Sequence, residues 1–472
     1  MGSSDLFKFT PFEWTMSNEF LGSVIEFAIR LCCTGQVDTE RFNTAIVSAL
    51  KQQPLLQANA SIGPTHSSSY WQAAADPAPV IRWLDGKPAI GRAALEDFQP
   101  INLEREIGFR FYGWQFQIDG QPQTEMRFIF QHACCDGKGA VSFIEDVLCQ
   151  YKLLKAGTCS ALPKFDGNRI LLRDQHTLRS YPLADRIWRT FVVRPRRAAN
   201  MLLARPVSMH CTTNDSPDVS AMVARQCSVT LSQEATEKIG AYAHSLGATT
   251  NLILARELFH VLGDYLKTNS TDANKSLTSS LVRILIPYSL RNERHQFMPA
   301  ANCVSMAYLE TKLDSLCQES QESSPLLEDL MEQFAFIEKW QLQYAWIEAI
   351  RAYARLWPLI GLLKRGREKS VGRPVGRQVA TTVLSNLGRV LSGGCLPNCK
   401  GKIVVDSLEI ETVHLILPCT DKLSVNFAVN FYRDCLTLDI SYLPSMVTRE
   451  TAQDLLDSWR CRILDTVERG SP

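Results

Sequence analysis

Hydrophobic and polar positions along the first part of the chain predict a series of strands with helices between them. The apolar run at 27–32 is typical of a strand, and Asp38 follows it as the N-cap of a helix over 39–51. Residues 80–84 predict another short strand. The alternating, aromatic-rich stretch 126–132 predicts a strand that ends at a histidine.

A turn and a helix are predicted directly after this histidine, His132. The cluster Asp-Gly-Lys-Gly at 136–139 breaks regular structure, and apolar residues then recur at helical spacing over 140–151. His132 is therefore expected where a strand turns into a helix, which is where open α/β sheets tend to place their sites.

The second part of the chain continues the alternation. Strands are predicted at 227–231, 281–286, 302–306, 427–431 and 436–442, and helices at 234–246 and from 251 to about 266. A long helix is predicted from Leu326 to Leu363, rich in Trp and Tyr, and Pro358 is expected to kink or end it. This helix runs into a basic stretch that extends to Arg377.

Length and composition indicate a soluble globular protein of two or three domains. The 472 residues are 45% hydrophobic and 21% charged, and the formal net charge of +1 offers no whole-protein field for nucleic acid. The 15 cysteines are scattered, which favours a reducing cytoplasm over a disulfide framework. Apart from the adjacent pairs Cys32-Cys33 and Cys134-Cys135, the one close pair is Cys395 and Cys399. No further ligands follow it at zinc spacing, so no metal site is expected.

The sequence His132-x-x-x-Asp136-Gly137 resembles the signature of the condensation-domain and chloramphenicol-acetyltransferase-like acyltransferase superfamily. Gln131 departs from the pattern, because many members have a second His there. Other stretches match the superfamily in the correct order. They are Gly35-x-Val-Asp38, Pro54-Leu-Leu56, Pro100 to Phe111, Pro287-x-x-Leu-Arg291, Asn302 to Met306, the Ser385-Asn386 turn and the hairpin that ends at Tyr442.

The resemblance implies an α/β (α+β) fold. Two chloramphenicol-acetyltransferase-like mixed-sheet domains would form a pseudo-dimer with a channel between them. We expect an N-terminal half at 1–185, a basic linker at 186–225 and a C-terminal half at 226–472, with the aromatic and basic helical segment at about 326–378.

The resemblance also implies roles for residues. His132 would be the general base of a ternary complex in which an acyl group passes from a thioester to an alcohol. Asp136 would pair with Arg291 and hold the loop, and Gly137 would permit the backbone shape and face the oxyanion. Ser385 and Asn386 would bind substrate near the channel. Acyl-CoA would serve as co-substrate, and no cofactor is expected.

Several alternatives stay open from the sequence. Cys134 and Cys135 are possible nucleophiles, although a tight turn and the superfamily's ternary-complex chemistry favour ordinary buried thiols. An amide-forming condensation enzyme that uses carrier-protein thioesters is the second enzymatic hypothesis. A non-catalytic binding protein on the same fold is the third, and the intact motif at 132–137 argues against it.

Two basic and aromatic stretches, at 187–205 and 340–377, suggest a peripheral membrane contact for a cytoplasmic, monomeric protein. The first holds five arginines and no acidic residue. Aromatic residues beside basic clusters are typical of interfacial membrane binding. The alternative is that the aromatic face packs on the protein and the basic residues are solvated.

Overall fold

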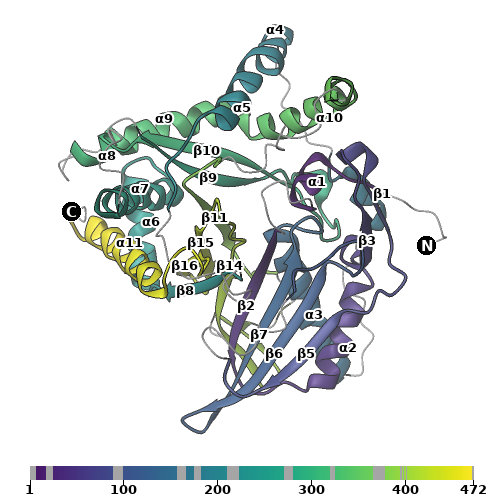
Figure 1. Cartoon of the computed structure of the whole chain (residues 1–472). Coiled ribbons are helices and arrows are strands. Elements are labelled where there is room, and N and C mark those ends of the chain that lie inside the picture. The colour runs from purple at the N-terminus through teal and green to yellow at the C-terminus, as the bar shows by residue number, and fades with distance from the viewer. Residues whose placement is uncertain are drawn as a thin grey trace.

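The computed structural model describes residues 7–17, 25–88, 99–156, 166–174, 182–209, 223–269, 280–318, 325–364, 378–393, 396, 398–399 and 401–469. Within these ranges the chain forms two large mixed sheets, a small three-stranded sheet and the helices that cover them (Figure 1). The predicted class, α/β with two mixed-sheet domains, is confirmed.

The first large sheet has the strand order β12-β13-β14-β2-β7-β6-β5. Its strands are β12 (Asn398–Cys399), β13 (Lys402–Val405), β14 (Leu408–Ile416), β2 (Glu26–Thr34), β7 (Gln121–Gln131), β6 (Phe109–Ile118) and β5 (Val80–Asp85). Helices α2 (Thr39–Leu50) and α3 (Gly137–Ala156) pack side by side against one face (Figure 1). The predicted N-cap is present, since Asp38 accepts a hydrogen bond from the Arg41 backbone N–H at 3.0 Å.

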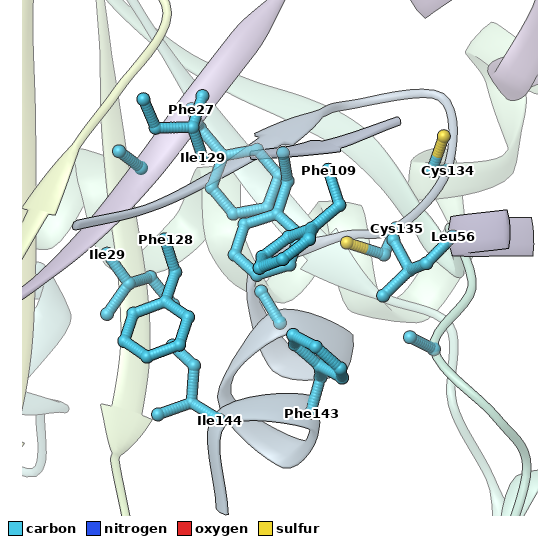
Figure 2. Close-up of a cluster of buried hydrophobic side chains, with 14 of the residues drawn as sticks. Phe27, Ile29, Leu56, Phe109, Phe128, Ile129, Cys134, Cys135, Phe143 and Ile144 are labelled. Carbon is cyan, nitrogen blue, oxygen red and sulfur yellow. The ribbon is translucent and has the colours of Figure 1, made fainter. Parts of the chain in front are cut away.

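An aromatic cluster fixes α3 beneath the end of β7. Phe109, Phe128 and Phe143 are fully buried, and Figure 2 shows them together with Phe27 and Ile144. The rings of Phe109 and Phe143 lie 5.1 Å apart at 74°, an edge-to-face contact. Burying each such side chain contributes roughly 1.5–3 kcal/mol. The loop between β7 and α3 therefore begins and ends on a rigid base.

The second large sheet has the order β10-β9-β11-β15-β16-β8. Its strands are β10 (Val304–Lys312), β9 (Leu281–Ser289), β11 (Thr382–Arg389), β15 (Val425–Tyr432), β16 (Cys435–Tyr442) and β8 (Arg225–Thr230). Helices α6 (Gln233–Ser245), α7 (Thr250–Asn269) and α11 (Arg449–Arg469) gather on one side of it (Figure 1). The predicted closing hairpin is confirmed, with Arg433 and Asp434 both at positive φ in its two-residue turn.

Strand β14 joins the two halves. It comes late in the chain, between β11 and β15, yet it pairs antiparallel with β2 of the first sheet, from Glu409–Thr34 to Ile416–Ala28. The sequence division at 186–225 did not predict this exchange. Because β14 and β2 are paired inside one sheet, backbone hydrogen bonds join the two halves.

A small sheet and a short helix close the N-terminal side. Strands β1 (Phe7–Lys8), β4 (Tyr70–Ala73) and β3 (Ala58–Ser61) form this sheet, and α1 (Pro11–Ser17) follows β1. The carboxylate of Glu13 is held by Arg173 at 2.6 Å and by the indole N–H of Trp71 at 3.1 Å. These buried contacts fix α1 beside the junction of the two halves.

The structure corrects one sequence prediction and adds detail to another. The basic stretch expected as a linker contains helical segments in its described part, namely α4 (Leu183–Trp188), a π-helical turn (Arg189–Val193) and α5 (Arg194–Leu203). The expected long helix is two helices, α9 (Pro325–Trp340) and α10 (Ala345–Lys364), because Gln341 between them adopts a left-handed conformation, φ 53°. Pro358 does not end α10, which continues to Lys364.

Three of the arginines in the basic stretch pack on the protein. Arg189 lies over the ring of Trp340, Arg194 over Tyr344 and Arg197 over Tyr308. Most of the basic residues expected after α10 fall at 365–377, outside the described residues. None of the helices in the described ranges is long and apolar enough to cross a membrane.

A substitution at Gly35 tests the packing of β14 against the first half of the chain. Its φ is +103°, and a Cβ there would lie 1.8 Å from the carbonyl oxygen of Ser407, next to β14. We expect Gly35→Ala to lower the free energy of unfolding by more than about 2 kcal/mol, because a backbone clash adds to the cost of a positive φ. Urea unfolding measures this change.

Gly86 is the matched control. It also has a positive φ, +80°, but nothing lies within 4 Å of its added Cβ. Gly86→Ala should show only the conformational cost, about 1–2 kcal/mol. Equal destabilisation by the two substitutions would contradict a tight junction at Ser407.

Candidate active site

His132 directly follows β7, as predicted. Its backbone N–H donates to the carbonyl oxygen of Ile25 at 2.8 Å, which keeps it in line with β2. The preceding Gln131 is buried and donates from Nε2 to the Met16 carbonyl at 3.1 Å, while its Oε1 accepts from the Ala133 N–H at 2.6 Å. Gln131, where the sequence departs from the superfamily pattern, thus ties α1 to the start of the loop after β7.

The imidazole of His132 is half-buried against two neighbours. The Phe27 ring lies 4.9 Å away, centroid to centroid. The side-chain amide of Asn302 donates to the His132 carbonyl at 2.6 Å and lies 3.4 Å from Nδ1. Nδ1 therefore faces Asn302 within the protein.

The surroundings of His132 disfavour its protonated form. Burial disfavours the imidazolium and is the largest influence on the pKa of His132. Hydrogen bonds to the carbonyls of His132 and Cys135, and the nearby charge of Asp136, act in the opposite direction but are outweighed. The pKa of His132 therefore lies below its ordinary value. A neutral imidazole can accept a proton at neutral pH.

Asp136 and Arg291 form a buried ion pair between the two halves. Nη1 of Arg291 contacts Oδ2 of Asp136, and Nη2 donates to the Ala301 carbonyl at 2.9 Å. The carboxylate also accepts from the Cys303 N–H and from the Gly139 N–H, each at 2.9 Å. Asp136 thus holds both the first turn of α3 and the segment that leads into β10.

These contacts decide the ionisation of Asp136. Burial raises the pKa of a carboxyl group, but the Arg291 charge and the hydrogen bonds from Arg291, Gly139 and Cys303 together outweigh it. The pKa of Asp136 lies below its ordinary value. The side chain is committed to these partners, so its geometry suits loop positioning and not proton transfer.

Gly137 is needed for close packing. It begins α3, and a Cβ there would lie 2.4 Å from the Leu387 side chain. Its φ is not positive, so the special backbone shape expected from the sequence is absent. The glycine instead lets β11 approach the start of α3.

Ser385 and Asn386 lie on β11, not on the turn predicted for them. The parallel pairing of β11 with β15 shifts register between Asn386 and Arg389. The Asn386 amide donates to the side-chain oxygen of Asn251, and Asn386 Oδ1 accepts from the Gly388 N–H at 2.6 Å. Ser385 is largely buried and makes no side-chain hydrogen bond within the described ranges.

All six predicted site residues line one cavity at the junction, with a volume of about 150 Å³. Its wall is mainly apolar and comes from both halves. The apolar residues include Phe12, Met16, Phe27, Ala28, Leu285, Val304, Met306, Trp346, Val383, Leu387 and Ile416. The polar groups His132, Ser385, Asn386 and the Asp136–Arg291 pair therefore face an apolar space, as in sites that bind small organic molecules.

Cys134 and Cys135 do not face this cavity. Both are fully buried in the loop after His132, where Figure 2 shows them beside Leu56. Burial raises the pKa of each thiol well above its ordinary value. This protonated state disfavours the nucleophilic role left open by the sequence.

Sequence reasoning missed the function of Asn302. The residue appeared only as the first member of a predicted strand, yet β10 begins two residues later and Asn302 instead holds the His132 backbone. An Asn placed before a strand is a weak signal, because that position also suits a turn. In the described part of the chain, no group of three or more His, Cys, Asp or Glu residues is arranged to hold a metal ion.

The buried pair makes a stability prediction. Asp136→Ala and Arg291→Ala should each lower the free energy of unfolding by about 3 kcal/mol, because each leaves a buried charge without its partner. The double variant should lose less than the sum of the two. Removing an exposed pair with Arg389→Ala, whose partner is Asp434, should have little effect.

The pH dependence of this effect has a defined sign. Folding lowers the pKa of Asp136. Its contribution to the free energy of unfolding is therefore fully present above the unfolded pKa of about 3.9. This contribution is lost as the pH falls through the lower pKa of the folded state. The stability difference between wild type and Asp136→Asn should shrink in that acid range. A difference that grows with acidity would contradict the ion pair.

The fold is similar to those of solved acyl-transferring proteins. Trichothecene 15-O-acetyltransferase TRI3 from Fusarium sporotrichioides matches with a TM-score of 0.64 and 13% identity, over 98% of this chain and 95% of that one. The first condensation domain of the CDA synthetase matches at 0.63 and 14%, over 99% and 97%. A starter condensation domain of rhizomide synthetase, in complex with C8-CoA, matches at 0.62 and 13%, over 98% and 95%.

No protein-family model matches the sequence. No curated protein matches it significantly either. At 13–14% identity, the structural matches establish the fold. The chain therefore has the two-domain fold of the condensation-domain and chloramphenicol-acetyltransferase-like superfamily.

Proposed function

We propose that the protein transfers an acyl group from a thioester donor to an alcohol acceptor, with His132 as general base. The observation that carries this proposal is the half-buried imidazole of His132 at the wall of an apolar cavity between the two halves. Acyl transfer needs a base at this position, since a hydroxyl group is a weak nucleophile until its proton is removed.

The residues suggest how the transfer proceeds. Nε2 of His132 takes the proton of the acceptor hydroxyl as its oxygen attacks the thioester carbonyl carbon. The tetrahedral intermediate then expels the thiolate, which receives the proton from His132. Helix α3 starts at Gly137 in the cavity wall, so its positive N-terminal end can stabilise the oxyanion. The hydroxyl group of Ser385, also in the wall, can donate a hydrogen bond to the same oxyanion.

Two structural relatives support the choice of substrates. TRI3 is named as an O-acetyltransferase, which supports a hydroxyl acceptor. The rhizomide synthetase domain is described in complex with C8-CoA, which supports acyl-CoA as donor. The apolar cavity wall suits an acyl chain. Acyl-CoA would act as co-substrate, without a bound cofactor.

Amide formation from carrier-protein thioesters is the second candidate function. Several matching structures are condensation domains, including that of the CDA synthetase. A panel of acyl thioesters with alcohol and amine acceptors, read by product mass, separates ester from amide formation. Absence of any product would favour the third hypothesis, a binding protein.

The general-base role predicts the effect of one substitution. His132→Gln should lower kcat by roughly 10²–10⁴-fold, because it removes proton transfer. Steady-state kinetics with the best donor and acceptor measure this. The matched control is His244→Gln on exposed α6, which should keep wild-type kcat. A folded His132→Gln protein with normal turnover would refute the assignment.

The pH profile offers an independent check. Because the pKa of His132 is lowered by burial, the base form should persist below the ordinary value of 6.5. The acid limb of kcat/KM against pH should therefore bend below pH 6.5. A bend clearly above that value would contradict the neutral imidazole.

A peripheral membrane contact also remains a proposal, now centred on α4 and the π-helical turn. Ile187, Trp188 and Phe191 are 50%, 49% and 74% exposed, and α4 protrudes from the molecule (Figure 1). Such apolar side chains can insert at the headgroup level. The aromatic residues Trp340, Tyr344 and Trp346 do not contribute, since they pack on the protein. We expect the protein to be a monomer.

The variant Trp188→Ser with Phe191→Ser should weaken sedimentation with anionic vesicles at low salt. Turnover of a short, soluble alcohol should not change, because these side chains lie away from the cavity. Leu246→Ser is the matched control, since Leu246 is 41% exposed and directly follows α6. Wild-type protein that ignores vesicles at low salt would exclude the contact.

A further inference from the structure

A second, smaller cavity lies directly beyond the wall of the candidate site. Its volume is about 10 Å³, close to the smallest space that holds one water molecule. It lies at the β10 edge of the second sheet, where α5 and the start of α10 lie beside that strand (Figure 1). Its lining includes Arg197, Ala198, Tyr308, Ile337 and Leu342.

Three side chains line both cavities and therefore form the partition between them. They are Met201 on α5, Met306 on β10 and Trp346 on α10. Met201 and Trp346 are buried, and Met306 is half-buried. The indole is large and rigid, whereas a methionine side chain is flexible and adapts to its surroundings. Trp346 is therefore the fixed part of the partition.

The order of residues on β10 places this partition away from His132. Asn302, which contacts His132, leads into β10, and Val304 and Met306 then line the cavity from one face of the strand. Met306 lies roughly 7 Å beyond Val304, because two residues of extended strand separate them. The cavity therefore runs from the histidine along β10 to the partition.

The pairing of β9 with β10 places the second cavity farther along the same strands. Leu285 on β9 pairs with Tyr308 on β10. Leu285 lines the first cavity, and Tyr308 lines the second. A ligand that extends from His132 along these strands therefore meets the partition first and the second cavity after it.

The two ends of the first cavity differ in polarity. The exposed Lys138, together with Ser289 and Arg291, lies at the end that holds His132, since Ser289 pairs with Val304. At the other end, the partition and Leu285 are apolar. The polar part of a thioester donor suits the first end, and its acyl chain suits the second.

We propose that Trp346, together with Met201 and Met306, limits the length of the acyl chain that the site accepts. The thioester lies beside His132, the chain follows β10, and its last carbon meets the indole. A cavity of about 150 Å³ holds a group the size of benzene, about six carbon atoms, so short chains are favoured. The identity of the ligand rests on the proposed acyl transfer, whereas the partition does not.

The first experiment measures, by calorimetry, the binding of unreactive alkyl-CoA thioethers from ethyl to dodecyl. In the wild type, affinity should rise with each methylene group and stop rising near about six carbons. In Trp346→Ala the rise should continue, and decyl-CoA should bind at least about tenfold tighter than to wild type, because one methylene group in an apolar pocket changes affinity by that factor or more. Met201→Ala opens the same partition from α5 and should give the same shift.

Two further variants make the result specific to the partition. Ile350→Ala is the matched control, since Ile350 is buried on α10 one turn after Trp346 and lines neither cavity. It should keep the wild-type dependence on chain length. Adding Ala198→Leu to Trp346→Ala should restore the preference for short chains, because the larger side chain fills the joined space. An identical chain-length dependence in wild type, Trp346→Ala and Met201→Ala would overturn the proposal, as would the absence of any thioether binding.

Turnover of the matching acyl-CoA series judges the proposed function separately. With one alcohol acceptor, kcat/KM should shift toward longer chains in Trp346→Ala. If the thioethers show the limit but wild type forms no product from any thioester, acyl transfer fails and the length limit stands. Turnover by wild type with an unchanged chain preference in Trp346→Ala would instead refute the limit and leave acyl transfer in place.

Discussion

The ion pair between Asp136 and Arg291 is the interaction on which the candidate site depends. It joins the loop after β7, from the first half, to the segment before β10, from the second. The same carboxylate holds the N–H groups of Gly139 and Cys303, and the adjacent Asn302 holds the carbonyl of His132. The position of His132 therefore depends on the contact between the two halves. A buried charge pair is costly to break and weakly stabilising in itself, which fits a role in positioning.

The second feature that shapes the candidate site is strand β14, which comes from the second half of the chain but pairs with β2 in the first sheet. Because this late strand completes the first sheet through β2, the wall formed by Leu415 and Ile416 is continuous with that formed by Ala28. The cavity between the halves is thus lined by one continuous sheet as well as by facing surfaces.

Much of the fold was predictable from local pattern. The helix with Asp38 as N-cap and the closing hairpin follow from capping and turn chemistry that acts over a few residues. The motif at 132–137 located the candidate site, because strand, loop and helix are contiguous there. The break at Gln341 was not predictable, since a left-handed Gln depends on tertiary packing. The pairing of β14 with β2 involves residues hundreds of positions apart and leaves no local signal.

The most direct test of the central claim is a crystal structure with a non-reactive thioether analogue of acyl-CoA. The proposed mechanism predicts that the acyl chain fills the apolar cavity, with the carbon that replaces the thioester carbonyl beside Nε2 of His132, leaving space for one hydroxyl group about 3 Å from that nitrogen. An analogue bound outside the cavity, or one whose reactive carbon lies away from His132, would contradict it.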